Sequence, residues 1–233
     1  MPCLVTDIVT VREVVPSDAP TLFELLSDPV VSEHLSVPPP SEAAFAGFIG
    51  WAQRQRTAGT AVCFGIVPNG LDQAVGIIQV RAMEPSFFVA EWGFALGAAF
   101  WSTGLFIESA NLVAQFAFET LNVDRLEARA VSQNGRGQAA LQKLGARPEA
   151  RLSRAFRKGQ RRDEQLLWTL REEDWRQRAL LGRRLNAVEA NEQIARAVEH
   201  TRRFMERQAL RPTPSVPCEF PFFVTDADDE SER

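Results

Sequence analysis

The segment that decides the fold is Glu91-Trp-Gly-Phe-Ala-Leu-Gly97, which continues two residues later as Phe100-Trp-Ser-Thr-Gly-Leu-Phe106. Its first half predicts a strand. Its second half predicts a loop that opens a helix, because apolar residues recur at helical spacing from 106 to 121. A strand over 125–131 and a helix over 134–144 are predicted to follow. The centre of the chain therefore has the order strand, loop, helix, strand, helix.

The flanking segments predict a mixed α/β fold with a mostly antiparallel sheet. Runs rich in strand-forming residues alternate with turn residues, and two helices are predicted on either side of an irregular segment, residues 28–40. The predicted strands outside the central segment are 8–14, 61–67, 73–83, 147–156 and 165–170, with 87–96 containing the first quoted stretch. The predicted helices outside it are 19–26 and 42–57.

Length and composition predict one domain with an extension. The chain has 233 residues, 45% of them hydrophobic, which is enough for one core. We expect a core domain over 1–174, a charged helical extension over 175–211 and an acidic tail over 212–233. The extension carries an imperfect apolar stripe, which we expect to pack on the chain's own core; the alternative is a second subunit, which would make a homodimer. The stripe consists of Trp175, Ala179, Val188, Ile194, Val198 and Met205.

The net charge and the cysteines argue against several classes of protein. The net charge of −4 provides no global basic field to attract nucleic acid or an anionic membrane. Cys3, Cys63 and Cys218 are odd in number and far apart, which argues against a disulfide framework or a metal site. The sequence shows no signal peptide and no apolar run of about 20 residues, as a membrane span requires. We therefore expect a cytoplasmic protein without a metal and without a membrane partner.

The loop before the long helix has the composition of an anion site. Several backbone N–H groups at a helix N-terminus can bind a pyrophosphate without side-chain cations, aided by the helix dipole. Ser102, Thr103 and Gly104 stand at this place. An ordinary connection between a strand and a helix would show the same glycine, so the motif alone leaves both readings open.

This order of motifs resembles the GNAT acyltransferase superfamily, in particular the ribosomal-protein alanine N-acetyltransferases, over residues 6–174. The resemblance implies a GNAT-like sheet flanked by helices. It also implies transfer of an acetyl group from acetyl-CoA to a primary amine, either a protein N-terminus or a small amine, by direct attack in a ternary complex. The implied cofactor-binding residues are Leu96, Trp101, Ser102, Thr103, Gly104, Leu105, Phe106 and Asn134.

The chain departs from the family's loop pattern, Gln/Arg-x-x-Gly-x-Gly/Ala, which aligns with Trp101 to Phe106. Only Gly104 matches fully. Trp101 replaces a polar residue, although an aromatic residue is common there in the resembling branch. Phe106 replaces a small residue that lets the cofactor approach. Its phenyl group either turns into the interface between helix and sheet or crowds the phosphate arm.

Two polar residues are the candidate catalytic groups. Strand alternation places Glu91 on one face with Gly93 and other small apolar residues, where desolvation would raise its pKa toward that of a general base. The resembling branch has a candidate base at this place; the alternative is an ion pair with a nearby Arg. Asn134 resembles the first residue of the family's Asn-x-x-Ser element, but Gly137 replaces the Ser. Asn134 is equally interpreted as a helix N-cap.

Other features bear on the acceptor. The chain has no Tyr, so the Tyr that many GNAT enzymes use as a general acid is missing. His34 lies in the segment that shapes the acceptor pocket in the family and is a candidate substrate contact, as is Glu91. The three departures also allow an alternative function, a weakly catalytic CoA-binding or protein-interaction module.

The last predicted hairpin is strongly basic. Its cations could attract an acidic peptide, RNA or the phosphates of CoA, although a solvated basic surface is the default interpretation. A nucleic-acid partner is therefore the weakest of these hypotheses. The cations are Arg151, Arg154, Arg157, Lys158, Arg161 and Arg162.

Overall fold

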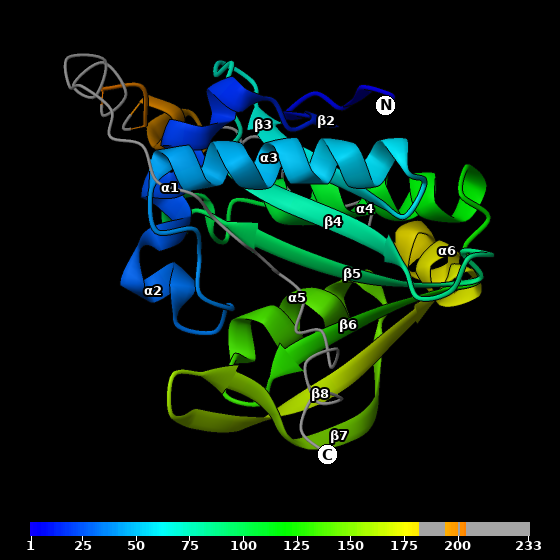
Figure 1. Cartoon of the computed structure of the whole chain (residues 1–233). Helices are drawn as coiled ribbons and strands as arrows, with labels where there is room; N and C mark the ends of the chain where they lie inside the picture. Colours follow the sequence, from blue (N-terminus) through cyan, green and yellow to red (C-terminus); the bar gives the residue numbers. More distant parts are fainter. Residues whose placement is uncertain (182–193, 200, 204–233) are drawn as a thin grey trace.

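The computed structural model describes residues 1–181, 194–199 and 201–203, and it contains an eight-stranded sheet in the order β1-β2-β3-β4-β5-β6-β8-β7 (Figure 1). Every neighbouring pair is antiparallel except β5 and β6. The predicted mixed α/β fold is confirmed. The strands are β1 (Leu4–Val5), β2 (Val9–Glu13), β3 (Ala61–Pro68), β4 (Gly76–Ala82), β5 (Val89–Leu96), β6 (Arg125–Val131), β7 (Arg147–Lys158) and β8 (Arg161–Arg171). The α-helices are α1 (Ala19–Ser27), α2 (Pro29–Ser32), α3 (Glu42–Thr57), α4 (Leu105–Glu119), α5 (Gly135–Leu144) and α6 (Glu172–Leu181).

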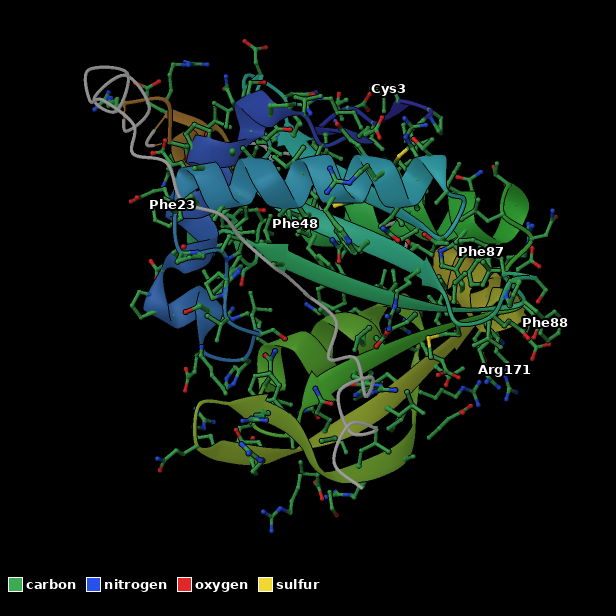
Figure 2. The ribbon with its side chains drawn as sticks, viewed as in Figure 1. Cys3, Phe23, Phe48, Phe87, Phe88 and Arg171 are labelled. Atoms are coloured by element: carbon green, nitrogen blue, oxygen red, sulfur yellow. The ribbon has the colours of Figure 1, made fainter. Side chains whose placement is uncertain are left out.

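Helices α1 and α3 cover one face of the sheet, and Figure 1 shows α3 crossing in front of β3 and β4. Helix α3 is capped by Ser41, whose Oγ accepts a hydrogen bond from the N–H of Ala44 (3.1 Å), the capping bond typical of a helix start. Its apolar residues Phe45, Phe48 (labelled in Figure 2) and Ile49 are fully buried. This packing holds α3 on the sheet. The segment predicted to be irregular, residues 28–40, directly precedes this helix.

Helices α4 and α5 cover the other face, and the described part of the extension packs on the same core. The indole of Trp175 in α6 lies 5.6 Å from the ring of Phe118 in α4, and Ile194 and Val198 are buried. The described residues of the predicted stripe thus lie on the chain's own core. Val188, Met205 and the side chain of Ala179 lie outside the described residues, as do Cys218 and the whole predicted tail.

An ion pair with a buried carboxylate fixes α1 against the sheet. Asp18, fully buried just before α1, accepts two hydrogen bonds of 2.8 Å from the guanidinium of Arg12 in β2. It also accepts from the backbone N–H groups of Val15 (2.8 Å) and Ala74 (2.9 Å). The hydrogen bond to Asp18 raises the pKa of Arg12. Because the carboxylate is fully bonded, the desolvation cost of burying it is compensated, and α1 and the following α2 are held in place.

The parallel pairing between β5 and β6 is short, and it creates the fork that matters for function. Only Val89–Glu91 pair with Arg125–Glu127. Beyond this point the rest of β5 pairs only with β4, and the rest of β6 only with β8. Figure 1 shows the two strands together at one end and diverging toward the other. A gap in the sheet therefore opens at the carboxyl ends of β5 and β6.

The structure differs from the predicted elements in the connecting segments. The predicted irregular segment contains the short helix α2, because Asp28 accepts a hydrogen bond from Val30 N–H (2.8 Å) and caps it. The last hairpin is longer than predicted and its strands are interrupted by irregularities, one of them between Leu152 and Phe156. Among the described helices, none is long and apolar enough to cross a membrane.

Candidate functional site

A cavity of about 1580 Å³ lies at the fork. Its walls come from the end of β5, the loop before α4, the facing sides of α4 and α5, the beginning of α6 and the segment around α2. At one end it is bordered by Val31 and His34, and at the other by Trp175 and Arg178. The cavity therefore connects the helical layer of α4 and α5 with the segment that follows α1.

The loop before α4 presents unused N–H groups to this cavity. Ser102 and Gly104 both adopt left-handed backbone conformations, with φ of 64° and 85°. Among the described residues, no hydrogen bond uses the N–H of Gly104, Phe106 or Ile107, all of which line the cavity. A Cβ on Gly104 would point into open space. Converging free N–H groups at the start of a 15-residue helix form an anion-binding arrangement.

Thr103 and Leu105 hold this loop in shape and do not line the cavity. The Thr103 hydroxyl donates to the carbonyl of Phe100 (2.8 Å) and accepts from the N–H of Leu105 (3.3 Å). Both side chains are buried. Thr103 and Leu105 are therefore absent from the cavity lining, whereas Leu96, Trp101, Ser102, Gly104, Phe106 and Asn134 line it. That these eight residues bind the cofactor stays a prediction.

Trp101 connects the two sides of the fork. Its indole N–H donates to the carbonyl of Leu96 at the end of β5 (2.8 Å). The guanidinium of Arg136, in the first turn of α5, lies over its ring at 4.2 Å, a cation–π contact. Arg136 lines the cavity and was missed by sequence reasoning. Its place in the run Asn134-Gly-Arg-Gly, at the start of a predicted helix, was the available signal.

Phe106 packs toward the sheet. Its ring centroid lies 4.5 Å from that of Phe94 in β5, and the side chain is half-buried against the main core. Of the two orientations left open by the sequence, the structure therefore shows the one in which the phenyl group turns into the interface between helix and sheet. The residue also forms part of the cavity wall.

Asn134 is the N-cap of α5. Its Oδ1 accepts a hydrogen bond from the N–H of Gly137 (2.9 Å), and the residue also lines the cavity. A Cβ at Gly137 would lie 2.7 Å from the Nδ2 of Asn134. The glycine at the place of the family's Ser is thus coupled to the capping conformation of Asn134, which would have to rotate to admit a larger residue.

Glu91 lies at the fork itself, within an ion-paired cluster. It is 5% exposed and its carboxylate contacts Arg81 of β4 at 2.5 Å and Arg129 of β6 at 3.7 Å. The expectation of small apolar surroundings is therefore wrong, because the register places one Arg beside it and a second across the gap. Glu91 is not among the residues that line the cavity.

The α2 segment and the last hairpin meet beside the cavity. His34 lines the cavity, and its Nδ1 is buried. The Nζ of Lys158, at the end of β7, donates to the carbonyl of Ser32 in α2 (2.5 Å). Burial, followed by the nearby charge of Arg161, lowers the pKa of Lys158. The hairpin thus borders the side of the cavity where His34 lies.

Comparison with known proteins agrees with this geometry. The family model described as Acetyltransferase (GNAT) domain matches residues 9–147. The uncharacterized N-acetyltransferase p20 of Bacillus licheniformis is 27% identical over 135 residues, which cover 58% of this chain and 76% of that protein.

Solved structures share the fold. RimJ of Mycobacterium smegmatis, in complex with CoA-disulfide, has a TM-score of 0.67 at 16% identity and covers 78% of this chain and 94% of its own. The ribosomal-protein-S5-alanine acetyltransferase of Vibrio fischeri has a TM-score of 0.65 at 17% identity, covering 75% and 99%. At these identities the likeness concerns the fold. With a family model that matches more than half of the residues, the chain belongs to the GNAT family of N-acetyltransferases.

Proposed function

We propose that this protein transfers an acetyl group from acetyl-CoA to the α-amine of a polypeptide or a small amine. The observation that supports this proposal most is the set of free N–H groups around Gly104, which face a cavity at the fork of the sheet. A pyrophosphate is the type of group that such an arrangement binds. Bound acetyl-CoA would supply an activated thioester: the amine nitrogen forms the amide bond, the carbon–sulfur bond breaks and the thiol leaves.

The residues of the cavity fit the cosubstrate. The N–H groups of Gly104, Phe106 and Ile107 would hold the pyrophosphate, and the guanidinium of Arg136 adds a positive charge across the cleft. Asn134 borders the gap and would contact the pantetheine arm. The cavity is also larger than a single acetyl group requires. These features support acetyl-CoA as the donor.

Among amine acceptors, an α-amine depends least on a general base in the site. The attacking amine must be neutral, and an α-amino group with a pKa near 8 is about one-tenth neutral at pH 7, whereas a lysine side chain is neutral several hundred times less often. The chain has no Tyr to act as acid, and Glu91 is ion-paired. The acceptor would reach the thioester from the side of His34, which we propose as a substrate contact.

Glu91 is better suited to holding the fork than to reacting in the cavity. Its carboxylate joins β4, β5 and β6 at the last residue of the parallel ladder, through Arg81 and Arg129. We therefore propose that Glu91 positions the two diverging strands. Strand alternation suggested instead that Glu91 is the general base. The two roles predict different effects of a Glu91 substitution on kcat and on stability, so an experiment can distinguish them.

Gly104→Trp should abolish most of the acetyl-CoA affinity, because its side chain would enter the open space beside the N–H groups. We expect the Kd, measured by calorimetry, to rise at least about tenfold, which corresponds to about 1.4 kcal/mol. Gly59→Trp is the matched control, since Gly59 also has positive φ and open space around it. Equal affinities of the two variants would contradict the assignment of the loop.

A peptide with a free N-terminus and no Lys should be a far better acceptor than an Nα-blocked peptide with one Lys. The expected ratio of kcat/KM at pH 7 is about 100 or more, given the pKa difference between the two amines. The rate for the free N-terminus should rise about tenfold per pH unit below its pKa and level off above it. Thiol release and mass spectrometry of the peptides measure both. A preference for the Lys peptide would contradict the acceptor class.

Glu91→Gln should lower stability more than it lowers the chemical step. Loss of the charge leaves two partly exposed guanidinium groups facing each other, and we expect a loss of about 2–3 kcal/mol in urea unfolding. Glu127→Gln, one strand away and paired with Arg125 (2.6 Å), is the control and should cost less than about 1 kcal/mol. Unchanged stability with kcat reduced over a hundredfold would instead identify Glu91 as the base.

A further inference from the structure

The tip of the β7–β8 hairpin concentrates positive charge in a way that its own fold does not require. Arg157 and Arg162 face each other across the two strands, and Lys158 faces Arg161 on the next rung. Like charges directly opposite each other on a sheet are destabilising. The chain nevertheless places two such pairs on successive rungs, one pair on each face of the hairpin, in a protein whose net charge is −4.

Carboxylates compensate only part of this charge. Arg151 is paired with Glu164 (2.9 Å) and Arg161 with Asp163 (2.8 Å). Within the described part of the chain, neither Arg154 nor Arg157 has an acidic partner, and both are exposed. Arg162 donates to backbone carbonyls at the turn. We define the basic hairpin surface by Arg151, Arg154, Arg157, Lys158, Arg161 and Arg162.

One of these cations, Arg154, has an unusual backbone conformation. Arg154 has a φ of 55°, a left-handed conformation that costs a non-glycine residue on the order of 1 kcal/mol. It lies where the β7–β8 pairing is irregular, between Leu152 and Phe156, on the edge strand of the sheet. Arg154 is exposed, and no strand of the sheet pairs with the outer edge of β7. Figure 2 shows nitrogen-tipped side chains along the outside of this hairpin.

The surface borders the acceptor side of the cavity. Lys158 bonds to Ser32 of α2, and the next residues of that segment, Glu33 and His34, line the cavity. From Lys158 to Arg151 the strand extends at most about 23 Å, at about 3.3 Å per residue, because its pairing is irregular between Leu152 and Phe156. This length exceeds a small amine metabolite and matches several residues of an extended polypeptide whose N-terminus enters the cavity.

Within strands β7 and β8, the lack of an exposed aromatic side chain favours a polypeptide over RNA. Single-stranded RNA is typically bound by exposed aromatic side chains together with basic residues. Phe156 and Trp168, the aromatic residues of β7 and β8, are both buried. Guanidinium groups, in contrast, bind carboxylates in a bidentate manner.

We infer that the basic hairpin surface binds an acidic segment of the acceptor polypeptide, downstream of the amine that is acetylated. This inference rests on the proposed function for the identity of the reaction, but the binding itself is independent of turnover. The acceptor class is therefore a protein or peptide with several Asp or Glu residues after its first few residues, rather than a free amine metabolite.

The experiment uses the full chain and synthetic peptides that share their first three residues and continue with either Asp/Glu or Ser/Gln residues. The test variant is Arg154→Asn with Arg157→Gln, because Asn tolerates a left-handed backbone. The control removes the same charge elsewhere: Arg54→Gln on α3 with Arg171→Gln, at the end of β8 far from the hairpin tip (Figure 2). Fluorescence anisotropy measures binding of Nα-blocked peptides, and thiol release measures turnover of the free ones.

We expect the acidic peptide to bind at least about tenfold more tightly than the neutral one in low salt, and the test variant alone to lose this difference. Turnover of the neutral peptide should stay the same in all three proteins. Equal binding of both peptides, or tight salt-dependent binding of an RNA oligomer that displaces the acidic peptide, would overturn the inference. If the acidic peptide binds as expected but no peptide is acetylated, the proposed function fails, whereas the binding of an acidic polypeptide segment by the hairpin stands.

Discussion

The short parallel ladder between β5 and β6 is the constraint on which the site depends. Three residues of each strand pair, and then each strand follows its other neighbour. A continuous sheet would satisfy the backbone groups on both sides, so the divergence requires something else in the gap. At the fork, the carboxylate of Glu91 bridges Arg81 and Arg129. At the open end, the loop around Gly104 and the start of α5 surround the cavity.

The helical layers supply the remaining parts of the site. Helix α4 brings its N-terminus to the gap, and Asn134, as the cap of α5, brings a second helix N-terminus beside it. Arg136 and Trp101 join the two across the cleft. On the opposite face, the Arg12–Asp18 ion pair holds α1, and α2 then meets Lys158 of the hairpin. The donor and acceptor of the proposed reaction would thus enter from different faces of one sheet.

The sequence predicted the elements because their signals are local. Helix periodicity, turn residues and the glycine at 104 need no knowledge of distant contacts, and the loop before α4 follows directly from them. Pairing the predicted strands symmetrically across the turn at 84–86 would have placed Gln79 opposite Glu91, whereas the structure pairs Arg81 with it, a shift of two residues. Arg129 could not be found in this way, because it reaches Glu91 only through the parallel pairing of β5 with β6, which is a tertiary contact.

The contacts of individual side chains were harder to predict than the secondary structure. Alternation on β5 correctly separated Glu91 from Trp92, but the partners of a buried carboxylate are set by neighbouring strands. Phe106, which departs from the family pattern, fits the interface only because Phe94 lies opposite it. The basic residues of the last hairpin were visible in the sequence, whereas the cross-strand pairing of like charges and the contact with α2 required the structure.

The most direct test of the account is hydrogen–deuterium exchange of the backbone N–H groups of residues 102–107, with acetyl-CoA and with acetyl-pantetheine, which carries the same thioester but no pyrophosphate. If the loop binds the pyrophosphate, acetyl-CoA slows exchange at these residues and acetyl-pantetheine does not. If acetyl-CoA slows exchange only elsewhere in the chain, the free N–H groups at the start of α4 are not the cosubstrate site, and the central claim is wrong.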